Sequence, residues 1–205
     1  MENVPMLSPT SICNQALSWN GEKPVASLDD NSTNAVWLRA NYPFFRDAVL
    51  EARMWTFATA REVSTVQDTD KWGTQFRHPI PQGWLQVFRV YRDVSGSDPA
   101  NWCRSDGWRR EGQYILANDS TVYLWGVERI TDTGKFSQMF AQCLAQRIAA
   151  EGALMWTGSR QKQVDAWNLY EAKMMEAATR DGQQGSNERI QSSSLINVRR
   201  GGGIR

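Results

Sequence analysis

Hydrophobic residues recur every three or four positions in several stretches of the chain, the spacing of a helix that buries one face. Ordered along the chain, the pattern predicts a short helix after Ser8, a second over 33–54, a third over 136–156, and a fourth that follows a break at 158–159 and ends at 181–182. The third and fourth helices are joined by a tight turn, so we expect them to pack antiparallel.

Local signals fix two of these helices more closely. Ser8 is a typical N-cap, Pro9 is tolerated in a first turn because its missing N–H has no partner there, and Gly21 marks the end of the first helix. Pro43 falls inside the second helix, where it crowds the carbonyl of Arg39. We expect a kink at this point rather than two separate helices.

Between these helices the hydrophobic period changes to the alternation of strands. One strand is predicted over 84–91, and a hairpin is predicted in which 113–116 pairs with 121–125. Asn118 and Asp119 supply the turn, since both residue types favour chain reversals.

Together the elements predict an α+β fold that is mainly α. We expect an antiparallel bundle of about four helices formed by 1–54 and 131–181, with an inserted antiparallel β-sheet or hairpin region over 55–130. Residues 182–205 form an extended and flexible C-terminal tail in this prediction, because their Gln, Ser, Asn and Gly cannot bury enough surface to fold alone.

Composition narrows the function classes. The 205 residues are 41% hydrophobic and carry 23 Lys and Arg against 22 Asp and Glu, a net charge of +1. This balance argues against a DNA binder that is basic throughout and against an acidic disordered chain. No apolar run is long enough for a membrane helix, and no export signal is visible, so we expect a soluble protein. Ten tryptophans are consistent either with extensive interfaces or with core packing.

Candidate chemistry is sparse. Neither a phosphate-binding P-loop nor the Gly-x-Gly-x-x-Gly pattern occurs, and the three cysteines have no metal-ligand spacing. A hydrolase of the Ser-His-Asp type would depend on His78, the only histidine, and paired carboxylates such as Asp68 and Asp70 are better explained as loop residues. We therefore expect no cofactor, no metal and no enzymatic activity.

Arginine and tryptophan are concentrated in the β-rich insertion. Between 77 and 110 there are six Arg against three Asp, a local balance of +3. Three interpretations remain open: solvated arginines above a tryptophan core, a protein interface, or a nucleic-acid surface where aromatic rings stack on bases. The candidate residues for an interface or a DNA channel are Arg89, Arg92, Trp102, Arg104, Trp108, Arg109 and Arg110.

The C-terminal tail combines polar residues with a few hydrophobic ones, as in segments that become ordered on a partner. A dispensable flexible end is the alternative. If the tail binds, the residues expected to do so are Ile190, Leu195, Ile196, Val198, Arg199 and Arg200.

The order of several short motifs resembles one known family. These motifs are Gly-Glu-Lys-Pro-Val-Ala-Ser-Leu at 21–28, Arg-Asp-x-x-Leu at 46–50, Trp-Thr-Phe-Ala at 55–58, Pro-x-Gly-Trp-Leu at 81–85, Glu-Gly-Gln-Tyr-Ile-Leu at 111–116 and Val-Glu-Arg-Ile-Thr-Asp at 127–132. In this order they are similar to bacteriophage head-to-tail adaptor proteins of the tail tubular protein A type. The resemblance covers about residues 8 to 181.

The resemblance implies a structural virion protein without catalytic activity, located at the head–tail junction after assembly in the host cytoplasm. Its partners are then the portal protein, the tail tube or nozzle protein, and further copies of itself in a ring of twelve subunits. DNA passes through the ring without being read, and the tail over 182–205 docks on the portal. The alternative based on the residues alone is a nucleic-acid binding packaging module that uses the Arg- and Trp-rich insertion.

Overall fold

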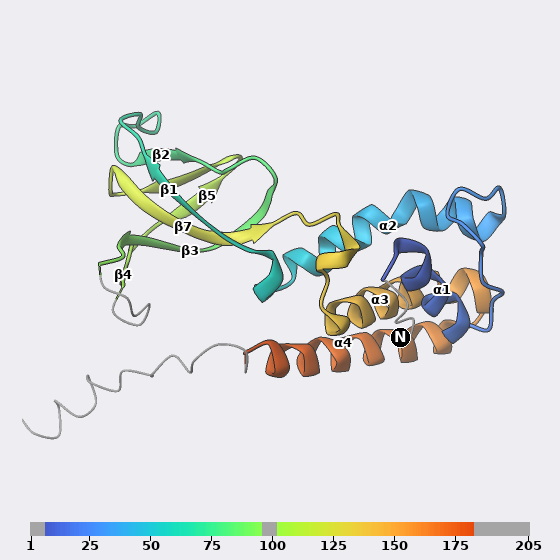
Figure 1. Ribbon diagram of the computed structural model, residues 1–205. Helices are drawn as coiled ribbons and strands as arrows, with labels where there is room; N and C mark the ends of the chain where they lie inside the picture. The colour runs from blue at the N-terminus through green and yellow to red at the C-terminus, as the bar shows by residue number, and fades with distance from the viewer. Residues whose placement is uncertain (1–6, 96–101, 183–205) are drawn as a thin grey trace, which may run out of the picture.

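The computed structural model describes residues 7–95 and 102–182. Over these residues the chain forms four α-helices and seven strands, with the strands gathered at one end of the molecule and the helices at the other (Figure 1). The helices are α1 (Pro9–Trp19), α2 (Thr33–Glu51), α3 (Gln138–Thr157) and α4 (Arg160–Gly182). The strands are β1 (Thr59–Thr65), β2 (Phe76–Pro79), β3 (Trp84–Asp93), β4 (Cys103–Arg104), β5 (Arg109–Glu111), β6 (Tyr114–Ala117) and β7 (Thr121–Glu128).

All four predicted helices are confirmed, and their ends follow from capping. The Ser8 side chain accepts a hydrogen bond from the backbone N–H of Ser11, and the Ser11 hydroxyl accepts one from the N–H of Ser8, a capping box. Gly158 ends α3 with a φ of 66°, a left-handed conformation that glycine adopts without steric cost. Helix α2 runs without a break through Pro43 and ends at Glu51, three residues earlier than the expected end at Met54.

The helices enclose one hydrophobic core. Leu17 of α1, Leu38 of α2 and Leu144 of α3 are fully buried in it, and Tyr170 of α4 is nearly so. Helices α3 and α4 pack antiparallel as predicted: Gln146 near the middle of α3 binds the backbone of Ala166 near the start of α4.

The strands form two antiparallel sheets. One sheet has the order β1-β7-β3-β4 and the other β2-β6-β5. Their facing sides enclose a second, smaller core, to which β3 contributes Val87 and Val90, β7 contributes Val122 and Leu124, and β6 contributes Ile115 and Ala117.

This topology shows that the predicted hairpin is wrong. Strand β6 pairs with β2 and β5, whereas β7 pairs with β1 and β3, so the chain crosses between sheets at 118–120 instead of reversing within one. Asp119 anchors the crossing, because its carbonyl oxygen accepts a hydrogen bond from His78 and its carboxylate accepts one from Ser105. Turn-forming residues indicate that the chain changes direction, but they do not specify which strands the segments on either side pair with.

The predicted fold class was also wrong in its proportions of helix and strand. The fold is mixed α+β, with 46% of the described residues in helix and 23% in strand, and not a mainly α helical bundle with a small insertion. The cause is that β1 has three consecutive exposed positions and β5 is exposed throughout, so neither shows the alternation by which strands are recognised.

Candidate interaction surfaces

The helical and β-rich parts meet at a junction built on Asp47 of α2. Asp47 Oδ1 accepts hydrogen bonds from Arg46 Nε at 2.9 Å and Nη2 at 2.8 Å, and Oδ2 accepts one from Arg129 Nε at 2.8 Å. Arg129 directly follows β7, while the Arg46 side chain is largely buried. One carboxylate thus joins α2 to the end of a strand far away in sequence.

Trp55 strengthens the same junction. It is fully buried between α2 and β1, its indole N–H donates to the carbonyl of Val49 at 2.8 Å, and its ring packs edge-on against Phe140 of α3 at 5.1 Å. Leu85 of β3 and Val127 of β7 belong to the same core as the helices. The two parts therefore share packed side chains and hold a fixed orientation.

On the first sheet, an aromatic and arginine-rich face lies opposite the small core. The register places Arg61 of β1 and Arg89 of β3 on either side of Trp125 of β7, and the two guanidinium groups lie over its ring at 4.2 Å and 5.2 Å. Arg61 also lies over Trp102, which packs edge-on against Tyr91. We call these five residues the aromatic face; part of it lines a pocket of about 310 Å³.

The structure brings together only some of the residues predicted for an interface or DNA channel. Arg89 and Trp102 belong to the aromatic face, and Arg89, Arg104 and Trp108 line a neighbouring cleft of about 310 Å³. Arg92 is exposed at the end of β3. Arg109 and Arg110 lie on β5 of the other sheet, where Arg109 pairs with Asp70 and Arg110 donates to two backbone carbonyls.

Sequence reasoning missed Arg61 and Trp125, the centre of the aromatic face. Trp125 stands at an alternating position of a recognised strand, but Arg61 lies in β1, whose pattern is not alternating. The cross-strand pair between them exists only once the register of β1 against β7 is known. An aromatic residue flanked by arginines on neighbouring strands could have been found from correct strand pairing.

A second exposed feature is Trp72, at 80% exposure in the loop between β1 and β2. Asp70 stiffens this loop: its carboxylate accepts hydrogen bonds from the backbone N–H groups of Trp72 and Thr74 and from the Thr74 hydroxyl at 2.6 Å. These bonds lower the pKa of Asp70, with Thr74 contributing most. The loop therefore presents the indole on a preorganised backbone.

His78 is fully buried between the two sheets. A carbonyl only accepts hydrogen bonds, so Nε2 donates to Asp119 O at 2.9 Å, and the other ring nitrogen is paired with the Ser64 hydroxyl at 3.1 Å. Burial lowers the pKa of the imidazole. This arrangement ties strands together and differs from a catalytic triad, in which a carboxylate orients the base.

Other chemistry-bearing residues lie apart. In the part of the chain that the structure describes, no three His, Cys, Asp or Glu residues gather as a metal site would require. Cys13 and Cys143 are buried, and burial raises the pKa of the Cys143 thiol to about 11, whereas Cys103 is exposed. Asp68, the other loop carboxylate considered above, pairs with Arg77.

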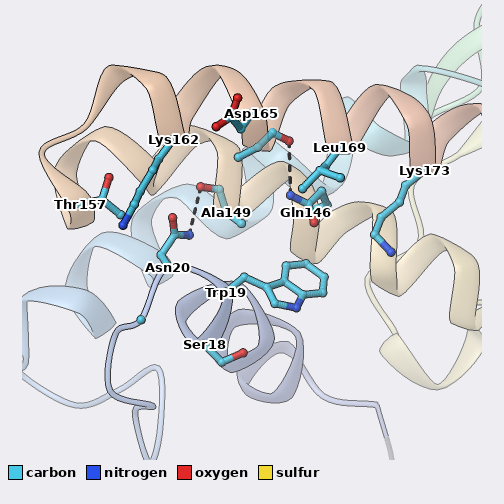
Figure 2. Close-up of a pocket in the computed structure, with 12 residues that line it drawn as sticks. Ser18, Trp19, Asn20, Gln146, Ala149, Thr157, Lys162, Asp165, Leu169 and Lys173 are labelled. Carbon is cyan, nitrogen blue, oxygen red and sulfur yellow. Dashed lines mark hydrogen bonds between the residues drawn. The ribbon is translucent and has the colours of Figure 1, made fainter.

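The helical part contains the largest of the pockets described here, about 750 Å³, between the end of α1 and the seam of α3 and α4 (Figure 2). Its lining includes Trp19, Gln146 and Leu169 from the three helices. Elsewhere on α4, outside the groove, Val164 and Met175 are also exposed. The hydrophobic pattern of the sequence did not single out any of these residues as a candidate for binding.

The predicted portal-binding residues Ile190, Leu195, Ile196, Val198, Arg199 and Arg200 lie outside the described residues. No protein-family model matches the chain, and no curated protein matches it. Among the described helices, none has both the length and the apolar character needed to cross a membrane.

Proposed function

We propose that this chain is a subunit of a bacteriophage head-to-tail adaptor, a virion protein that forms a ring between the portal and the tail tube or nozzle. The observation that carries the proposal is the convergence of three separate motifs on one junction. Arg46-Asp47, Trp55 to Ala58 and Val127 to Arg129, which carry the resemblance to the tail tubular protein A type, contact one another or share one core. Motifs that fix one joint support a common architecture better than isolated matches do.

Two unlike exposed surfaces support a role in assembly. The helical part presents apolar side chains of α4 outside the groove, among them Val164 and Met175 at 47% and 71% exposure, and the β-rich part presents Trp72 and the aromatic face. A ring of identical subunits joined head to tail needs two different complementary surfaces on each subunit. The rigid junction at Asp47 holds the two surfaces in a fixed relation, which ring closure requires.

The tail and the overall charge complete the proposal. In this role, residues 182–205 dock on the portal through their few hydrophobic side chains and the Arg199-Arg200 pair. The net charge of +1 suits a channel wall along which DNA slides without being bound tightly. The family resemblance supplies the number of twelve subunits.

The test is cryo-electron microscopy of the full chain mixed with the portal protein of its own particle, with no symmetry imposed. We expect a ring of this chain on the portal, and we expect deletion of 183–205 to leave a folded protein that no longer joins the portal. A control that replaces the same residues with a Gly-Ser linker separates loss of side chains from loss of length. Particles without a ring, or unimpaired joining after deletion, would contradict the proposal.

The nucleic-acid module is the alternative, and one observation weighs against it. The guanidinium groups of Arg61 and Arg89 already lie over Trp125, so this ring is engaged within the protein and not free for stacking on bases. A binding titration with duplex DNA at several salt concentrations separates the two functions. A slope of several units in log K against log salt, at about 0.9 per phosphate contact, favours the module.

A further inference from the structure

The groove in the helical part has the composition of a peptide-binding site. Trp19 of α1 and Leu169 of α4 form its walls at 42% and 56% exposure, and Ala149 and Ala166 are among the small residues that line it (Figure 2). Its volume of about 750 Å³ is in the range of ligand sites. Exposed large hydrophobic residues around such a groove favour a partner that brings an apolar side chain.

Gln146 adds a polar group that lacks a partner. The side chain is only 4% exposed, and its Nε2 donates to the Ala166 carbonyl at 3.3 Å. This bond fixes the amide orientation, since an amide oxygen in that position would face another oxygen. The Oε1 atom then points toward Trp19 and has no hydrogen-bond partner among the described residues (Figure 2). This oxygen is open to the groove on a side chain that the Ala166 bond holds in place, so a ligand N–H group can donate to it.

Two lysines give the groove a positive rim. Lys162 and Lys173 line it from α4, and neither ammonium forms an ion pair with another described residue. Lys173 instead lies over the Trp19 ring at 5.7 Å. Asp165 is the single acidic residue that lines the groove, and its carboxylate accepts a hydrogen bond from the Gln161 amide. Two lysines against one aspartate leave the lining of the groove with a net charge of +1, which is complementary to an acidic partner.

We propose that this groove binds an acidic peptide segment of a partner protein, with a hydrophobic side chain between Trp19 and Leu169. Carboxylates of the segment pair with Lys162 and Lys173, and one of its backbone N–H groups donates to Gln146 Oε1. The site is separate from the proposed ring contacts and does not depend on them.

Two other occupants fit less well. A phosphate backbone carries acceptor oxygens only, so it brings no N–H donor for Gln146. The chain's own residues 183–205 carry four Arg against one Glu, so the lysine rim repels them. The Gln146 oxygen and the two lysines of the rim together favour a peptide with acidic side chains.

The test begins with a library of random twelve-residue peptides, selected against the full chain. We expect selected peptides to combine Asp or Glu with a large hydrophobic residue. When one of them is synthesised and added to ¹⁵N-labelled protein, the indole N–H signal of Trp19, assigned with Trp19→Phe, should shift. The double variant Lys162→Glu, Lys173→Glu should bind this peptide about tenfold more weakly or worse, because like charges across an interface are strongly unfavourable.

The matched control is Lys71→Glu, Lys135→Glu, which changes the net charge equally at two exposed positions outside the groove. It should bind the peptide like the unaltered chain. The proposal is overturned if the selection returns no peptide that shifts Trp19, if the selected peptides are neutral or basic, or if both double variants weaken binding alike. A twelve-base-pair DNA duplex that shifts Trp19 and displaces the peptide would assign the groove to polyanions instead.

Discussion

Replacing Asp47 with alanine tests whether the junction fixes the two parts of the molecule. The substitution removes three N–H···O contacts of 2.8 to 2.9 Å, two from Arg46 and one from Arg129. The Arg46 side chain is 10% exposed, so it is left as a nearly buried guanidinium without its carboxylate. The Arg129 side chain is 49% exposed, so water replaces much of its lost partner.

The expected cost follows from this difference in burial. Loss of the hydrogen bonds between Arg46 and a charged acceptor costs about 2–3 kcal/mol. Loss of the half-exposed bond to Arg129 adds about 0.5–1 kcal/mol to this cost. The higher helix propensity of alanine offsets roughly 0.5 kcal/mol of it. We therefore expect Asp47→Ala to lower the free energy of unfolding by about 2–3.5 kcal/mol, measured by urea denaturation followed by circular dichroism.

Asp29→Ala is the matched control, because Asp29 pairs with Arg39 at 4.0 Å while its side chain is 92% exposed. This variant should change stability by less than about 0.5 kcal/mol. A double-mutant cycle between Asp47 and Arg129 should give a coupling of about 0.5–1 kcal/mol. Equal effects of the two aspartate substitutions, or no coupling, would refute the junction as described.

Three further predictions concern the core, the buried histidine and the exposed loop. An alanine methyl at Gly126 of β7 would overlap a backbone oxygen of β3, whereas one at Gly152 of α3 would overlap a tryptophan ring. A side chain moves more easily than the backbone of a paired strand, so we expect Gly126→Ala to be the more destabilising of the two substitutions in thermal denaturation. Burial lowers the pKa of His78 in the folded chain below its ordinary 6.5, so the unfolded chain binds the extra proton more readily. The contribution of the neutral imidazole to the free energy of unfolding is therefore fully present above pH 6.5 and is lost as the pH falls from 6.5 toward the folded-state pKa. Urea titrations from pH 7.5 to 5 should show this loss, and its absence in the wild-type chain would contradict the buried neutral imidazole. Trp72→Ala should change the free energy of unfolding by less than about 0.5 kcal/mol. Trp55→Ala removes a fully buried ring and should lower it by about 3–5 kcal/mol. Similar values for both variants would show that one of the two rings is placed wrongly.

The helices could be predicted because their signals are local. The N-cap at Ser8 and the stop at Gly158 act on neighbouring residues, and the three-to-four spacing of hydrophobic residues reflects burial of one continuous face. The second sheet could not be predicted in this way. Its strand β5 buries no residue, and its strand β6 buries three consecutive positions, so neither alternates.

The aromatic face was predictable only in part for a related reason. Arg89 and Trp102 could be named from composition, but the contacts of Trp125 with Arg61 and Arg89 arise from the register of three strands. Composition identifies residue types that suit interfaces, and register decides which of them meet. Arg109 and Arg110 show the converse, since residues close in sequence to Trp108 belong to a strand of the other sheet.

The groove illustrates a further limit of periodicity, because it arises from unequal helix lengths. At 1.5 Å per residue, the 11 residues of α1 extend about 16 Å, whereas the 20 residues of α3 extend about 30 Å. Helix α1 can therefore cover only part of the seam between α3 and α4. The groove opens where α1 ends at Trp19, and there the seam exposes Leu169 and the Gln146 oxygen that a longer α1 would have covered. A hydrophobic stripe predicts which face of a helix is buried, but the length of the covering helix decides where that burial stops and a partner can bind.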